Sequence, residues 1–219
     1  KSYRLMMLPL QNITYVITPV MLPVFSELQS DRKSLGQKYF KLIKLLAYVS
    51  FSLSIILFGC ARELVLFVFG SQWEESIIPF QILTFTVAFQ ILTSTTGSIY
   101  QAVGATKQMF ISGCWGAFFM ATSFFITIFH WHTIEAVCYG YLVAQIANTT
   151  QCFWLLFKII EIPITKIAEL CIRPLVISGG LLLVYYIYSL HPLILPLFLS
   201  LVAKGVLGLV VSIVLIQLI

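Results

Sequence analysis

The chain has 219 residues, of which 60% are hydrophobic and only 10% charged, and its mean hydropathy is +1.00. A soluble domain carries about 25% charged residues, so this composition excludes a soluble globular protein, and the 15% of aromatic residues excludes a disordered one. The net charge of +5 comes from scattered cations and not from a basic face, which argues against a nucleic-acid partner. The sequence therefore predicts an all-α integral membrane protein.

Seven stretches are apolar over about 20 residues, the length that crosses the hydrocarbon core as a helix. They are residues 5–25, 42–60, 77–100, 109–129, 134–157, 174–190 and 193–218. Between the second and third stretches, the apolar run 64–69 is too short to cross, and Gly70 follows it as a helix C-cap would. We predict a short interfacial helix there, with Trp73 at the depth of the lipid headgroups.

The first stretch is a broken helix with one polar face. Pro9, Pro19 and Pro23 interrupt its hydrogen-bond ladder, and such interruptions in a bilayer are buried in protein or face a watery cavity. The polar residues on one helix face are Arg4, Gln11, Tyr15 and Thr18. Transporters place substrate on broken helices of this kind. The alternative is that the prolines are ordinary kinks and the polar residues bond to neighbouring helices.

Two further stretches carry polar stripes at helical spacing. The third has Thr86, Gln90, Ser94, Gly97 and Gln101, and the fifth has Tyr141, Gln145 and Asn148, extended by Gln151 or Cys152. Amides are costly in hydrocarbon unless neighbours or water satisfy them, so the three stripes predict a shared interior surface. The candidate substrate-cavity residues are Arg4, Gln11, Tyr15, Thr18, Gln90, Ser94, Gln101, Tyr141, Gln145 and Asn148. Helix packing alone would also explain any single stripe.

Few other side chains suggest chemistry. Lys204 lies near the middle of the last stretch, where a cation is costly, so we expect it to face other helices or a groove beside the last two spans. It is a candidate contact for a lipid phosphate; the alternative is that it snorkels to the membrane surface. His130 and His132 lack a third metal ligand apart from the distant Glu135. No nucleotide or nucleophile motif is present, so the sequence predicts neither an enzyme nor a cofactor.

The basic residues predict an orientation, because short cytoplasmic loops retain Lys and Arg. Nine cations fall on one side of the predicted spans: Arg32, Lys33, Lys38, Lys41, Lys44, Lys107, Lys158, Lys166 and Arg173. The other side has three: Lys1, Arg4 and Arg62. The first span should therefore run from outside to inside, with the C-terminus in the cytoplasm.

Several segments resemble a known family. Residues 3–13 (YRLMMLPLQNI), 20–26 (VMLPVFS), 61–65 (ARELV), 69–73 (FGSQW) and 97–104 (GSIYQAVG) are similar to the C-terminal half of bacterial polysaccharide flippases. These proteins form the polysaccharide transporter family of the multidrug/oligosaccharidyl-lipid/polysaccharide superfamily. The resemblance implies a C-lobe bundle of about five spans at residues 1–160, two additional helices at 161–219, and an absent N-terminal lobe.

The resemblance also implies a function. Such a protein would flip lipid-linked (undecaprenyl-pyrophosphate) oligosaccharide repeat units across the bacterial inner membrane, with the polar stripes holding the sugars and the lipid tail staying in the bilayer. The partners implied are the lipid-linked oligosaccharide, membrane lipid and the missing N-terminal lobe. The alternatives are a multidrug exporter of the same superfamily, for which we expect a carboxylate inside the membrane and find none in the sequence, or a scaffold subunit that transports nothing.

Overall fold

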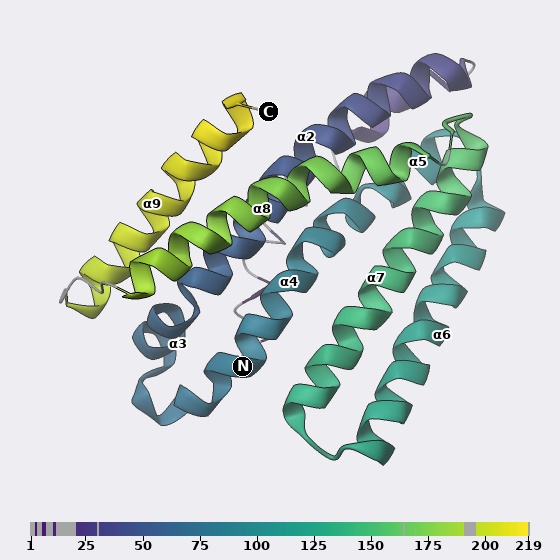
Figure 1. The fold of residues 1–219 in the computed structure, drawn as a ribbon. Helices are drawn as coiled ribbons and strands as arrows, with labels where there is room; N and C mark the ends of the chain where they lie inside the picture. Colours follow the sequence, from purple (N-terminus) through teal and green to yellow (C-terminus); the bar gives the residue numbers. More distant parts are fainter. Residues whose placement is uncertain are drawn as a thin grey trace.

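The computed structural model describes Tyr3, Met6, Met7, Gln11 and residues 21–29, 31–163, 165–190 and 196–218. Every regular element in this part of the chain is a helix (Figure 1). In chain order they are α2 (Arg32–Gly59), α3 (Ala61–Phe69), the 3-10 turn η1 (Ser71–Ser76), α4 (Ile77–Ser94), α5 (Thr96–Ala102), α6 (Thr106–His130), α7 (Ile134–Ile159), α8 (Lys166–Leu190) and α9 (Leu197–Leu218). The predicted all-α membrane fold is confirmed.

Five helical segments of the described chain are long and apolar enough to cross a membrane. They are Arg32–Gly59, Ser71–Ala102, Thr106–His130, Leu170–Tyr188 and Leu197–Gln217. Each corresponds to one of the seven predicted stretches. A sixth stretch forms α7, which is 26 residues long. It is not among the five segments that are apolar enough to cross a membrane, and it carries a run of polar residues at 148–151. The first stretch lies mostly outside the described residues.

The short helix predicted between the second and third stretches is confirmed. Helix α2 starts at the N-cap Asp31, whose carboxylate accepts a hydrogen bond from the backbone N–H of Ser34 at 3.0 Å. This bond holds the pKa of Asp31 below its usual range. Helix α3 follows α2 after Cys60 and ends at Gly70, whose φ of 85° is available to glycine without strain. Trp73 then packs beside Phe69.

Helices α2, α4 and α7 form the centre of the bundle. Helix α2 packs on α4 and α8, and α7 packs between α4 and α6. The main apolar core joins Leu35, Tyr39 and Ile43 of α2 to Leu156 and Phe157 of α7. Helices α6 and α9 lie at opposite edges of the molecule (Figure 1), and they are the least buried of the five candidate spans.

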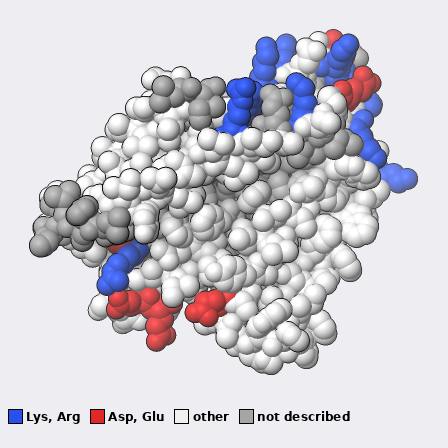
Figure 2. All heavy atoms as spheres, viewed as in Figure 1, with Lys and Arg blue, Asp and Glu red and all other residues white. Residues whose placement is uncertain are grey.

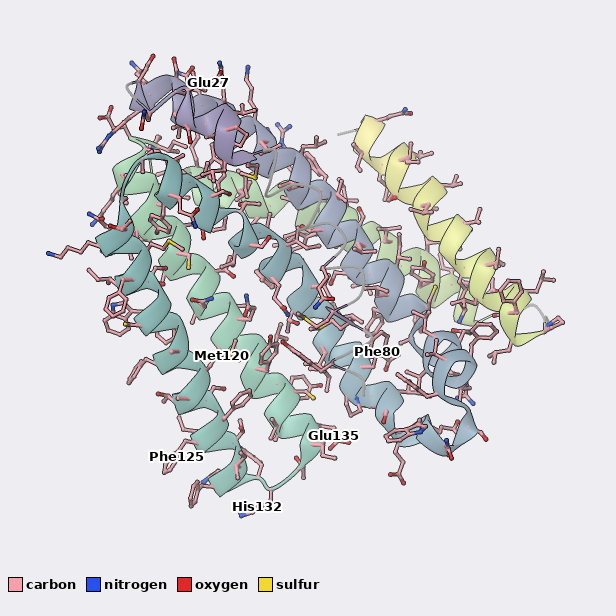
Figure 3. The ribbon with its side chains drawn as sticks, turned by 180° about the vertical axis from the view of Figure 1, so that it is seen from behind. Glu27, Phe80, Met120, Phe125, His132 and Glu135 are labelled. Atoms are coloured by element: carbon pink, nitrogen blue, oxygen red, sulfur yellow. The ribbon has the colours of Figure 1, made fainter. Side chains whose placement is uncertain are left out.

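Helices α6 and α7 form a hairpin that projects from one end of the bundle. Figure 3 shows His132 and Glu135 at its tip and Phe125 pointing outward from α6. Thr133 caps α7 by accepting a hydrogen bond from the backbone N–H of Ala136 at 3.3 Å. Among the residues that the structure describes, no three His, Cys, Asp or Glu side chains come together as a metal site would require.

The two ends of the bundle differ in charge. Figure 2 shows most Lys and Arg gathered at the end where α2 begins, with some acidic residues among them, whereas the end near α3 and η1 carries mainly acidic residues. We expect single cysteines introduced at Ser34 and Ser71 to be labelled from opposite sides of intact cells, because the positively charged end should face the cytoplasm. A membrane-impermeant maleimide, with and without permeabilisation, measures this. Equal labelling of both positions in intact cells would contradict the orientation.

Candidate functional site

The polar stripe of α4 faces the N-terminal segment of the chain. The amide of Gln90 donates to the hydroxyl of Thr86 at 2.8 Å, and that hydroxyl lies 3.3 Å from the sulfur of Met6. Thr86 and Met6 are both fully buried, whereas Gln90 is half-buried. The N-terminal segment therefore meets the polar stripe of α4 through Met6, which is not one of the polar residues predicted for that segment.

A second polar contact joins α4 to α7. The hydroxyls of Thr93 and Thr149 lie 2.8 Å apart, and Thr149 also donates to the backbone carbonyl of Gln145 one turn earlier. Gln145 is buried, with 4% of its surface exposed. We call Thr86, Gln90, Thr93, Gln145 and Thr149 the α4–α7 seam. Its hydroxyls bond between and within the two helices, as interhelical polar residues do in membranes.

Tyr141 lies one turn before Gln145 on α7 and contacts aromatic rings on both sides. Its ring stacks on Phe124 of α6, with centroids 6.1 Å apart and planes at 11°. The edge of Tyr3 meets it from the N-terminal segment, with centroids 6.0 Å apart. The N-terminal segment thus contacts α4 through Met6 and α7 through Tyr3.

Asn148 belongs to a different polar group. It faces α6, where a Cβ atom added to Gly116 would lie 2.7 Å from the Asn148 side-chain oxygen. On the same side, the hydroxyl of Ser112 lies 3.0 Å from the sulfur of Cys152 and 3.4 Å from the side-chain oxygen of Gln151. The polar stripe of α7 therefore meets two neighbouring helices. Gln145 lies one turn before Thr149, which contacts α4, whereas Asn148 faces α6.

The remaining candidate residues lie apart from the seam. Ser94 donates to the carbonyl of Ile91 in its own helix, and Gln101 is exposed at the end of α5. Gln11 is exposed as well. Arg4, Tyr15 and Thr18 lie outside the described residues. Of the ten candidate side chains, Gln90 and Gln145 belong to the seam and Tyr141 lies one turn before Gln145, whereas Asn148, Ser94 and Gln101 lie elsewhere. A common substrate surface for all ten stays a prediction.

Lys204 faces other helices, as predicted, and its partner is a carboxylate. Its ammonium lies 2.6 Å from Oε1 of Glu63 and donates to the carbonyl of Gly59 at 3.4 Å. Only 18% of the Lys204 side chain and 9% of the Glu63 side chain are exposed. Two expectations need correction. Helix α9 begins at Leu197, so Lys204 is about two turns from its start and not at its centre, and a carboxylate does lie inside the bundle.

Sequence reasoning missed three groups that the structure brings together. Thr93 and Thr149 carry the α4–α7 contact, and each continues a predicted polar stripe at helical spacing. Ser112 was not singled out, because one serine in an apolar stretch gives no signal. Glu63 lies just before the apolar run 64–69, where the sequence gives no sign of burial, and α3 turns its side chain inward.

Comparison with known proteins supports the family resemblance. Residues 1–78 match the family described as polysaccharide biosynthesis protein. TuaB of Bacillus subtilis, a teichuronic acid biosynthesis protein, is 21% identical over 189 residues, covering 86% of this chain and 39% of TuaB. WzxC of Escherichia coli, a lipopolysaccharide biosynthesis protein, is 25% identical over 157 residues, covering 72% of this chain and 32% of WzxC.

A third relative and one solved structure are also similar to this chain. A membrane protein in the cps region of Klebsiella pneumoniae is 26% identical over 161 residues, covering 72% of this chain and 32% of that protein. The solved structure of the lipid II flippase MurJ in an inward closed conformation matches 99% of this chain and 45% of MurJ, with a TM-score of 0.75 and 17% identity. The chain therefore has a MurJ-like fold and spans about a third of the length of the curated relatives.

Proposed function

We propose that the chain forms the C-terminal lobe of a flippase for lipid-linked oligosaccharides, on the strength of its similarity to polysaccharide biosynthesis proteins and its MurJ-like fold. The substrate would be an undecaprenyl-pyrophosphate-linked repeat unit, moved across the bacterial inner membrane. The observation that carries the proposal is the fold match to a lipid-linked substrate flippase along 99% of the chain. The N-terminal lobe of the same protein would complete the cavity.

In this proposal the N-terminal segment and the α4–α7 seam form the wall of the sugar cavity. Gln90 is half-buried and bonded within its own helix, so its carbonyl oxygen remains available to a sugar hydroxyl. Arg4 would grip the pyrophosphate bidentately, which a lysine could not copy. In this proposal Lys204 has a structural role, because its ammonium is paired with the carboxylate of Glu63.

The two alternative functions have less support. A multidrug exporter should use a carboxylate that is free to bind a cation or a proton, whereas Glu63 is paired with Lys204. A scaffold subunit needs exposed helix faces for its partners, and α6 is exposed along nearly its whole length. A bilayer covers such a face as well as a partner helix would, so exposure alone does not favour a scaffold.

Complementation of a deletion strain by the full-length protein tests the proposed function. We expect the intact gene to restore surface polysaccharide, and its loss to leave lipid-linked repeat units accumulated at the cytoplasmic face. Arg4→Ala and Arg4→Lys should both impair export at normal protein level, and Gln11→Ala should have a milder effect. Arg62→Lys is the matched control, since Arg62 is 63% exposed in a surface pair with Glu74. Full export by Arg4→Lys would remove the phosphate role, and normal polysaccharide without the gene would refute the function.

A further inference from the structure

The Glu63–Lys204 pair joins residues that are 141 positions apart in the chain. Glu63 lies in the first turn of α3, at the corner where α2 ends, and Lys204 lies on α9. The hydroxyl of Ser200, one turn before Lys204, lies 3.4 Å from the same carboxylate oxygen. Two polar side chains of α9 therefore converge on one acidic group of the α2–α3 corner.

The backbone at Lys204 is also bonded to the bundle. Tyr185 of α8 donates its hydroxyl to the carbonyl of Lys204 at 2.9 Å. The ring of Tyr185 lies against Gly59 of α2, where an added Cβ would come within 2.7 Å of it. Helices α2, α8 and α9 thus meet at one polar point, close to the end of α2.

Elsewhere α9 is apolar and largely exposed. Only 11% of its most apolar 18-residue stretch is buried. Ser212 is also buried, but its hydroxyl donates to the carbonyl of Leu209 in the same helix. In a bilayer, apolar contact between helices has no hydrophobic driving force, because lipid tails solvate the same surfaces equally well. Polar contacts should therefore decide whether α9 stays on the bundle.

A cavity of about 410 Å³ lies beside this polar point. Residues of α2, α4, α8 and α9 line it, among them Gly59, Gln81, Tyr188 and Lys204. Lys204 therefore belongs both to the ion pair and to the wall of the cavity. If α9 moved away from α2, this wall would open towards the bilayer.

We propose that the Glu63–Lys204 ion pair is a clasp that holds α9 against the α2–α3 corner and closes the adjoining cavity. The clasp acts through geometry and charge. Undocking of α9 would separate the carboxylate of Glu63 from the ammonium of Lys204 and leave each charge uncompensated in an apolar medium, which is energetically costly. The inference does not depend on the transported substrate.

Cross-linking of the full-length protein in native membranes tests the clasp. Phe67 of α3 and Phe198 of α9 have ring centroids 5.6 Å apart, so cysteines at these two positions, in a cysteine-free background, report docking of α9 through a short bismaleimide. We expect Glu63→Gln and Lys204→Met each to lower the cross-linked fraction severalfold. The exchange of charges, Glu63→Lys with Lys204→Glu, should restore it.

Two controls separate undocking from misfolding. A cysteine pair at Gly180 and Leu215 lies within the α8–α9 hairpin, where an added Cβ on Gly180 is 3.1 Å from Leu215, and its yield should not change. Glu74→Gln breaks only the surface pair with Arg62 and should leave both yields unchanged. An unchanged α3–α9 yield in both single variants overturns the proposal, and so does an equal loss of both cross-links. Neither result depends on export activity.

Discussion

Replacing Gly36 by leucine should destabilise the protein by about 3 kcal/mol, at the upper end of the usual cost of overpacking a core. Gly36 is buried in α2, and a Cβ atom there would overlap the backbone carbonyl oxygen of Ile160 at the end of α7. The same Cβ atom would also lie 3.2 Å from Cγ1 of Ile162. Because the obstructing atom is backbone, it cannot turn aside as a flexible side chain would, and α2 must separate from α7.

Gly113 is the matched control for this prediction. It lies in α6, and a Cβ atom added there would meet no described atom within 4 Å. Gly113→Leu should therefore leave the melting temperature of the purified full-length protein in detergent nearly unchanged, while Gly36→Leu lowers it by several degrees. Similar melting temperatures for the two variants would show that α2 and α7 do not depend on this close contact.

The sequence predicted features that depend on neighbours in the chain. The break at Gly70 follows from a short apolar run and one glycine that can adopt positive φ, so α3 could be predicted. Five of the seven apolar stretches correspond to candidate spans for the same reason, since length and composition set a span. The uneven count of Lys and Arg on the two sides of the predicted spans agrees with Figure 2, where most of these residues gather at one end of the bundle.

The polar stripes were predicted less well, because spacing gives one face of a helix but not the neighbour of each residue. Successive residues of a helix point about 100° apart, so Gln145 and Asn148 can share a stripe and still meet different helices. Gln145 lies on the α4 side, whereas Asn148 faces Gly116 of α6. Only the packing of α7 between α4 and α6 decides this division.

Glu63 could not be predicted, because its partner lies 141 residues away. Its surroundings in sequence, beside Arg62 and before Glu74 and Glu75, are typical of an exposed connection. A weak signal was present on the other side of the contact. Ser200 and Lys204 are four residues apart in an otherwise apolar helix, so they lie on one face and predict a polar partner.

Removing Lys204 alone should therefore cost more than removing the whole ion pair. Lys204→Met leaves the Glu63 carboxylate buried without a counter-ion, which typically costs about 3–5 kcal/mol. In the double variant Glu63→Leu with Lys204→Met, apolar side chains of similar volume replace both charges, a change that is often neutral or stabilising. The double variant should melt above Lys204→Met, because it leaves neither charge unpaired.

The surface pair Arg62–Glu74 provides the control for this cycle, because its side chains are 63% and 57% exposed. Breaking it with Arg62→Met should cost about 0–1 kcal/mol, since water screens both charges whether or not they are paired. Thermal unfolding of the wild type, Lys204→Met, the double variant and Arg62→Met in one detergent gives the comparison. If Lys204→Met and the double variant lose equal stability, Glu63 is solvated in solution, and the energy of the contact comes from packing of the lysine stem and not from its charge.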